Sequence, residues 1–198
     1  MPSFLDRPLH QPRRSDRAIA DDAWIEAFLD RMPMMTLALL SGGHPFVNTN
    51  LFAFDAAHRT VIIHTAPFGR LIETVDAAPD GVPACLTVFE MGRLLPAERA
   101  KNFSVEYSSV VAFGTLRRLH EPEAIAIALQ ALMDKYAPHL MASSDYAPAS
   151  DAELRTTGTF CFHIDAWSAK QKNAPDDFTG AYYYQDVQRS PTQLADPR

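Results

Sequence analysis

The sequence predicts a mostly β fold with flanking helices, in which six antiparallel strands form a closed or partly closed barrel. Six strand-like runs are joined mostly by hairpin turns. They do not alternate regularly with helices, which argues against a doubly wound parallel sheet. The chain has 198 residues, of which 47% are hydrophobic and 21% charged, so we expect one domain with a full core.

The first half of the chain begins with a polar, arginine-rich stretch over 1–17, which we interpret as an arm. A helix is predicted over 23–31, because Trp24, Ile25 and Phe28 follow a helical spacing and Pro33 ends the pattern. An antiparallel meander follows, with strands expected at 35–40, 46–54 and 60–65.

The second half continues the same architecture. Here the pattern predicts a short helix at 69–78, strands at 82–89, 107–119 and 156–167, a loop at 90–106 and an amphipathic helix at 124–136. The domain should therefore run from 18 to 172, followed by a tail over 173–198.

Composition and charge exclude several classes of protein. A net charge of −6 argues against a general nucleic-acid binder. No apolar run approaches the length of a membrane span, and the first residues do not resemble a signal peptide. Cys85 and Cys161 lie far apart in strand-like runs, so we expect reduced thiols in a cytoplasmic protein.

The most informative segment is 60–71, an apolar strand that ends in His64-Thr65 and turns through Pro67 and Gly69. A helical pattern begins directly at Arg70-Leu71. This arrangement brings free backbone N–H groups, a hydroxyl and a guanidinium to one point, as in sites that bind phosphate. The alternative is an ordinary strand-turn-helix connection with an exposed arginine.

Other polar side chains interrupt apolar strands. Asn48 and Asn50 share one face with phenylalanines, so either this face lines a polar cavity or the two amides form hydrogen bonds inside the fold. Ser108-Ser109 opens the fifth strand, and Trp167 and Lys170 lie together at the end of the last one.

Familiar catalytic signatures are absent from the sequence, and the seven histidines show no spacing typical of a metal site. His64 differs from the others because it lies beside the candidate anion site.

Taken in order, five motifs resemble the FMN-binding split-barrel superfamily related to pyridoxamine 5′-phosphate oxidase, and within it the nitroimidazole-resistance (Nim-type) branch. The motifs are Arg13-Arg14-Ser-Asp-Arg17; Pro45-Phe46 to Asp55; His64-Thr65 with Gly69-Arg70-Leu71; Phe103 to Thr115; and Trp167-Ser-Ala-Lys170. They extend over residues 13–172. Asn48-Thr49-Asn50 departs from many relatives, and Leu71 stands where many have lysine.

The resemblance implies FMN in a groove between the two barrels of a homodimer. Gly69 and Arg70 would hold the phosphate, together with Thr65 and the start of the following helix. The other residues that it implies at the cofactor are Asn48, Thr49, Asn50, His64, Leu71, Ser108, Ser109, Trp167 and Lys170. The amides would contact the edge of the flavin ring, the serines the ribityl chain or phosphate, and Trp167 with Lys170 would close the site near the dimer seam.

The resemblance further implies an oxidoreductase that reduces a small, electron-poor molecule. His64 would be the catalytic residue, either as a proton donor or in substrate docking. Two alternatives stay open: a non-catalytic flavin- or haem-binding protein, with His64 or His163 as an axial ligand, and a deazaflavin in place of FMN. An oxidase that forms pyridoxal phosphate is disfavoured, because its Arg-x-His motif is missing after Trp167.

Overall fold

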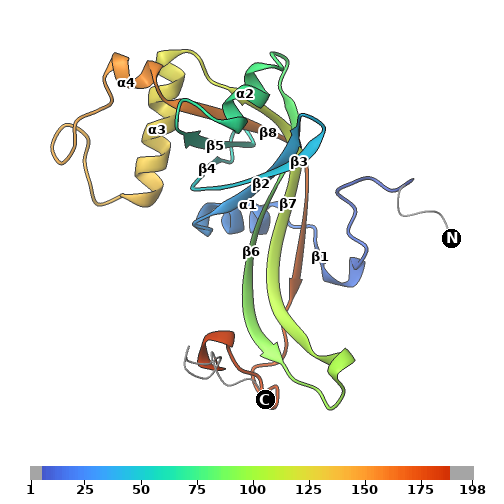
Figure 1. Ribbon diagram of the computed structural model, residues 1–198. Coiled ribbons are helices and arrows are strands. Elements are labelled where there is room, and N and C mark those ends of the chain that lie inside the picture. Colours follow the sequence, from blue (N-terminus) through green and yellow to red (C-terminus); the bar gives the residue numbers. More distant parts are fainter. Residues whose placement is uncertain (1–5, 188–198) are drawn as a thin grey trace, which may run out of the picture.

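A computed structural model describes residues 6–187. It contains one eight-stranded antiparallel sheet flanked by helices (Figure 1), with the strand order β3-β2-β6-β7-β8-β5-β4 and the short β1 paired to β8. The mostly β class is confirmed, but the expected count of six strands is wrong, and the sheet is not closed, since β3 and β4 end the path as unpaired edges.

The strands are β1 (Ala18–Ile19), β2 (Met35–Ser41), β3 (His44–Asn50), β4 (Ala53–Asp55), β5 (Thr60–Thr65), β6 (Val82–Leu95), β7 (Ser104–Arg118) and β8 (Gly158–Lys172). The α-helices are α1 (Asp22–Arg31), α2 (Arg70–Asp76), α3 (Pro122–Tyr136) and α4 (Asp151–Arg155). Short 3₁₀ turns occupy Ser15–Arg17, Ala100–Asn102 and Tyr184–Val187. Among residues 6–187, no helix is both long and apolar enough to span a bilayer.

The core lies on the inner face of the curved sheet, where alternate strand residues meet α1 and α2. Phe28 of α1, Leu37 of β2, Leu86 of β6 and Phe162 of β8 are nearly inaccessible to solvent. Burying such side chains contributes roughly 1.5–3 kcal/mol each, so this packing holds both helices against the sheet.

The strand predicted over 46–54 is in fact two strands, β3 and β4. Between them, the Tyr136 hydroxyl accepts a hydrogen bond from the backbone N–H of Phe52 (3.0 Å) and lies 2.9 Å from the Phe52 carbonyl oxygen. The chain thus leaves the β2 edge at this point, and a tyrosine of α3 satisfies the backbone groups that the sheet no longer pairs.

The loop predicted over 90–106 is largely wrong. β6 continues to Leu95 and β7 begins at Ser104, so the two strands form a long ribbon that extends away from the helices (Figure 1). A register shift between Met91 and Leu94 lets the ribbon continue past the polar residues that suggested a loop.

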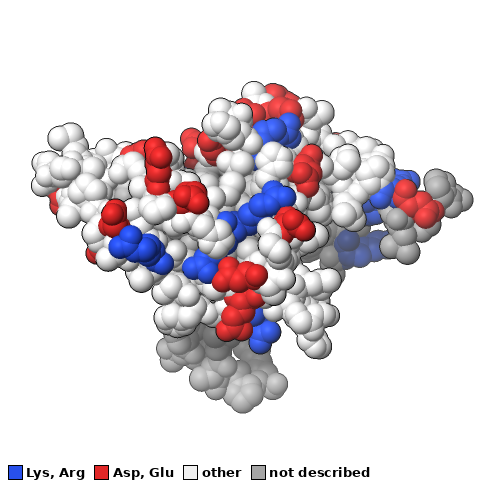
Figure 2. Space-filling view, turned by 90° about the horizontal axis from the view of Figure 1, so that it is seen from above, with Lys and Arg blue, Asp and Glu red and all other residues white. Residues whose placement is uncertain are grey.

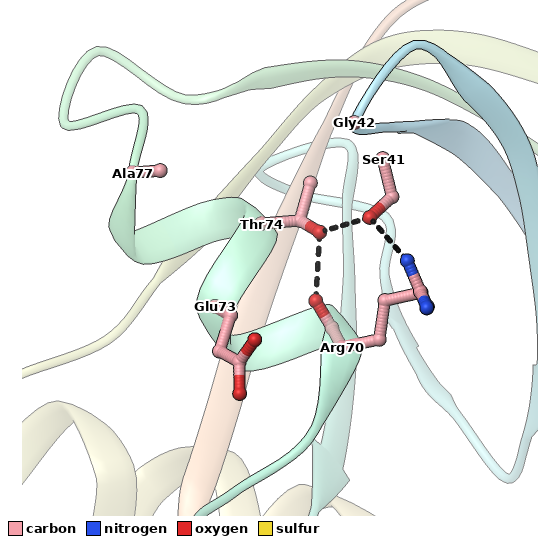
Figure 3. A pocket seen from close by; sticks show the side chains of 6 residues that line it. All are labelled: Ser41, Gly42, Arg70, Glu73, Thr74 and Ala77. Atoms are coloured by element: carbon pink, nitrogen blue, oxygen red, sulfur yellow. Dashed lines mark hydrogen bonds between the residues drawn. The ribbon is translucent and has the colours of Figure 1, made fainter.

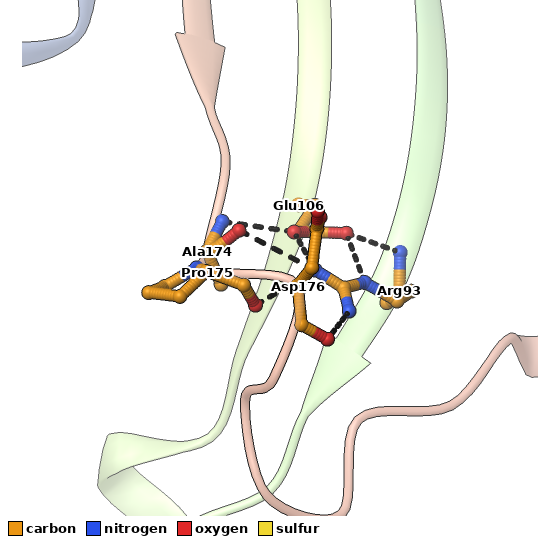
Figure 4. A network of polar contacts seen from close by, with 5 residues as sticks. All are labelled: Arg93, Glu106, Ala174, Pro175 and Asp176. Carbon is orange, nitrogen blue, oxygen red and sulfur yellow. Dashed lines mark hydrogen bonds and ion pairs between the residues drawn. The ribbon is translucent and has the colours of Figure 1, made fainter.

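The segment that follows β8 folds back onto the end of this ribbon (Figure 4). Arg93 and Glu106 form a mostly buried ion pair (2.8 Å), and Arg93 also donates to the carbonyl oxygens of Ala174, Pro175 and Asp176. Within the described part of the predicted tail, Tyr182 pairs with Leu94 through two backbone hydrogen bonds. The remainder of that tail, from 188 on, and residues 1–5 of the predicted arm lie outside the described residues.

Charge is mixed on the face of the molecule seen from above (Figure 2), where Lys and Arg alternate with Asp and Glu. That face therefore carries no broad patch of a single charge.

Candidate functional site

Arg70 faces an open cavity of about 570 Å³ between α2 and the end of β2 (Figure 3). The cavity is lined by Ser41, Gly42, Arg70, Glu73, Thr74 and Ala77. Gly69 precedes α2 with φ +119°, a conformation that favours glycine, so the chain turns sharply from β5 into a helix that starts at Arg70. The predicted strand–turn–helix around Gly69 and Arg70 is therefore confirmed.

Among residues 6–187, the guanidinium of Arg70 makes one side-chain hydrogen bond, a long one of 3.5 Å from Nη1 to Ser41 Oγ. Ser41 is buried, and its hydroxyl lies 2.8 Å from that of Thr74. Glu73 points away from the guanidinium (Figure 3), and among the described residues no carboxylate forms an ion pair with Arg70. An uncompensated cation beside two hydroxyls suits an anionic group with several acceptor oxygens.

His64 lines a different cavity, of about 760 Å³, which lies mainly between α3 and the segment 146–157. Its walls are mainly apolar side chains of α3 and of residues 146–149, with Gln130, Tyr146 and Glu153 at polar positions. The imidazole has no hydrogen-bond or ion-pair partner in the described part of the chain. An imidazole without a partner at the wall of an apolar cavity can bind the metal ion at the centre of a flat ligand, or exchange a proton with a bound molecule.

His64 and Thr65 are consecutive in β5, so their side chains point to opposite sides of the sheet. Thr65 is half-buried and donates a hydrogen bond to the Ala66 carbonyl oxygen (3.0 Å). Neither residue lines the cavity of Arg70. The structure thus separates His64 from the predicted anion site, although only five residues lie between His64 and Arg70 in the sequence.

The same alternation divides the other predicted cofactor residues. Asn48, Asn50, Ser108 and Trp167 point to the inner side, while Thr49, Ser109 and Lys170 point to the outer side. Leu71 is a buried core residue of α2. Asn50 Nδ2 is buried without a partner among residues 6–187, whereas the Ser108 hydroxyl accepts a hydrogen bond from Gln171 (3.1 Å).

The sequence suggested that Trp167 and Lys170 lie together, but the structure places them on opposite sides of the sheet. The indole Nε1 of Trp167 donates to Asp22 Oδ1 (2.9 Å), and the Arg59 guanidinium covers the ring at 3.9 Å. Trp167 therefore connects α1 to the sheet, while Lys170 pairs with Ser109 on the other side of β8.

Lys170 and Ser109 are also far from Arg70 within one chain. β8 pairs Gly158 with Thr65, close to α2, and Lys170 with Ser109, twelve positions further on. At roughly 3.3 Å per residue this separation is about 40 Å along the strand. No single copy of the chain brings all of the predicted cofactor residues together.

Between Arg70 and the Ser109–Lys170 pair, the sheet has an uncharged surface that no helix within residues 6–187 covers, and we call it the outer face. It consists of Thr36, Ala38, Leu40, Val47, Thr49, Cys85, Thr87, Phe89, Ser109, Val111 and Phe113. Leu40, Val47 and Phe89 are each more than half exposed. All of the α-helices that contribute to the main core pack on the opposite side.

Sequence reasoning missed Ser41, Thr74 and the α3 wall of the His64 cavity. Ser41 lies directly after the strand predicted over 35–40 and before Gly42-Gly43, a pair typical of a hairpin turn. One available signal was its place in the strand, because the alternation of Leu37 and Leu39 continues to position 41 and gives its hydroxyl an inward direction.

Comparison with known proteins identifies the family. The sequence model for pyridoxamine 5′-phosphate oxidase matches residues 21–171, which is most of the chain. The chain belongs to this family. No curated protein matches it.

Solved structures support the same fold. A flavocytochrome from Azotobacter vinelandii is 25% identical, with a TM-score of 0.72 over 96% of this chain and 88% of that one. An FAD and heme binding protein from Mycobacterium smegmatis is 24% identical (TM-score 0.69, 80% and 74% covered). A candidate 5-nitroimidazole antibiotic resistance protein from Bacteroides thetaiotaomicron is 19% identical (TM-score 0.62, 78% and 86% covered). The last two likenesses concern the fold alone.

Proposed function

We propose that the chain is a flavin-binding oxidoreductase that holds the flavin phosphate, that of FMN in the simplest case, in the cavity of Arg70. The observation that carries this proposal is the Arg70 guanidinium, which has no carboxylate partner among residues 6–187 and faces a cavity with the hydroxyls of Ser41 and Thr74. Membership of the pyridoxamine 5′-phosphate oxidase family and the likeness to a flavocytochrome support it.

The residues of the chain fit such a group. Arg70 would donate charge-assisted hydrogen bonds to phosphate oxygens, and the Ser41 hydroxyl would donate another from the buried wall of the cavity. Thr49 and Val47 would line the path of the ring along the outer face. The flavin, when bound, would supply the electron or hydride transfer to a small electron-poor substrate, such as a nitroimidazole.

We further propose that two copies of the chain complete the site. Lys170 and Ser109 lie too far from Arg70 to reach the same flavin in one chain. A two-fold dimer that buries the outer face would bring these residues of one copy to the flavin of the other. The uncharged, exposed character of Leu40, Val47 and Phe89 supports a protein contact at this face.

The visible absorbance of the purified protein tests the flavin proposal. We expect flavin bands near one equivalent per chain, or their appearance on adding FMN. Replacing Arg70 with alanine should weaken FMN binding about 10- to 100-fold, the equivalent of roughly 1.5–3 kcal/mol for a charged hydrogen bond. Arg99→Ala, at the exposed end of the ribbon, is the matched control and should retain the cofactor. A wild-type protein that takes up no flavin would refute the proposal.

A second candidate function, haem binding in addition to the flavin, is favoured by the His64 cavity. The cavity volume of about 760 Å³, its apolar walls and the partnerless imidazole suit a flat macrocycle with an iron that accepts one nitrogen ligand. The likeness to a flavocytochrome supports this candidate.

Haem titration distinguishes the two histidines that the sequence offers as ligands. The wild-type chain should give a Soret band with a haem:chain ratio of one, and His64→Ala should abolish it. His163→Ala should leave it unchanged, because His163 is exposed on β8 and does not line the cavity. Loss of the band in His163→Ala alone would exclude the His64 cavity as the haem site.

A further inference from the structure

Thr159 contains a buried hydroxyl that has no partner. The residue lies near the start of β8, its side chain is 0% exposed, and among residues 6–187 Oγ1 makes no hydrogen bond. An unpaired hydroxyl in the interior costs free energy, on the order of 1–3 kcal/mol, so a strand of this kind would more readily carry valine at that position. The presence of a hydroxyl here therefore calls for a partner.

His64 is the polar side chain best placed to be that partner. β5 and β8 pair His64 directly opposite Thr159, so both side chains lie on the same side of the sheet. Side chains that face each other in this way have their Cβ atoms about 4.5–5.5 Å apart. A rotation about side-chain bonds is then enough to bring an imidazole nitrogen within hydrogen-bond distance of Oγ1.

The other hydroxyl nearby is already satisfied. Thr157 lines the cavity with His64, and its Oγ1 donates to the Glu153 carbonyl oxygen at 2.8 Å. Thr159 and His64 are thus two side chains without partners that face each other beside a cavity of about 760 Å³.

We propose that Thr159 is a positioning residue for His64 in the haem site of the second candidate function, on which this inference rests. Its hydroxyl accepts a hydrogen bond from one imidazole nitrogen. The other nitrogen then keeps its lone pair and points into the cavity, where it can bind the iron. Partners of this kind fix the tautomer and ring orientation of histidines that bind metals, and their loss lowers metal affinity about 10- to 100-fold.

Spectrophotometric haem titration of the full chain tests the proposal with three variants. Thr159→Val removes the hydroxyl at nearly constant shape, and we expect haem affinity to fall about 10-fold. Thr159→Ser retains the hydroxyl and should remain within about twofold of the wild type. Thr157→Val removes the neighbouring hydroxyl of the same cavity as a matched control and should change the affinity far less than Thr159→Val.

Urea unfolding of each variant separates positioning from a folding defect, since Thr159→Val should unfold at the wild-type midpoint or above it once the unpaired hydroxyl is gone. Equal haem affinities of Thr159→Val and the wild type would overturn the role of Thr159 alone. A similar loss in Thr159→Ser and Thr159→Val would also overturn it. A wild-type chain that binds no haem would overturn both this inference and the haem function, with the flavin proposal unaffected.

Discussion

Gly114 illustrates how a single residue fixes the geometry of the sheet. It lies where β7 and β8 shift register, after Phe113, and a Cβ atom at this position would lie 1.8 Å from the backbone oxygen of His163. The two strands approach so closely here that only glycine fits without a backbone movement.

Replacing Gly114 with alanine should therefore destabilise the protein by roughly 2–4 kcal/mol, measured as the free energy of unfolding in urea. Gly43→Ala is the control: Gly43 has φ +79° but open space around it, so backbone strain of about 1 kcal/mol is its only cost. Equal effects of the two substitutions would contradict the close approach of β7 and β8.

Also at the residue scale, the sequence located candidate polar positions but did not show which of them lie together in the fold. The Gly69-Arg70 turn follows from local chemistry, because glycine, arginine and a helical pattern are adjacent in sequence. His64 and Thr65, or Ser108 and Ser109, are neighbours in the chain yet point to opposite faces, and only the strand pairing decides which face meets a cavity. Ser41 joins Arg70 through a contact between residues 29 positions apart, which no local pattern contains.

At the scale of elements, the positions of the helices α1, α2 and α3 were predictable from apolar spacing and from Pro33 and Pro122. The ends of β6 and β7 were not. Arg93 and Glu106 appeared as loop residues because they are charged, but they pair with each other across the ribbon and with the returning chain. From sequence alone, a charged side chain that pairs with a distant segment cannot be distinguished from one that is exposed to solvent.

Hydrogen bonds from Arg93, and then from the backbone N–H of Ala174, lower the pKa of Glu106 to about 2. This folded-state pKa is below the ordinary value of 4.5, so the ionised Glu106 carboxylate stabilises the folded state. Its stabilisation is complete above about pH 4.5 and is lost as the pH falls from there towards 2. The attachment of the 174–182 segment to the ribbon should weaken over the same range.

Replacing Glu106 with glutamine should release that segment at neutral pH as well. We expect the amide hydrogens of Leu94 and Tyr182, which are bonded across the contact, to exchange several-fold faster than in the wild type. Glu98→Gln, near the end of the same ribbon, provides the control. Unchanged exchange in the Glu106 variant would show that the backbone pairing holds the segment without the ion pair.

At the scale of the whole molecule, the open sheet leaves its outer face without a covering layer from the described part of the chain, residues 6–187. Burying this uncharged surface in a two-fold dimer would explain why the residues predicted for one cofactor site lie in two distant groups. The proposed dimer would therefore be needed to complete the proposed flavin site.

Sedimentation of the purified protein should give a dimer, and Val47→Glu should convert it to a monomer that binds FMN more weakly, because a buried unpaired carboxylate opposes association. Ile127→Glu, at a side chain of similar exposure on α3, should remain dimeric. A monomeric wild type that binds one FMN per chain would contradict a shared site.

The central claim is that Arg70 holds the phosphate of the flavin, and it is tested most directly by comparing FMN with riboflavin, which lacks the phosphate. In the wild-type protein we expect the dissociation constant of FMN to be about 10- to 100-fold below that of riboflavin. In Arg70→Ala this ratio should fall to roughly one, because the phosphate loses its charged partner while the ring keeps its contacts. A ratio that stays the same in Arg70→Ala, or a wild type that binds both flavins equally, would contradict the account.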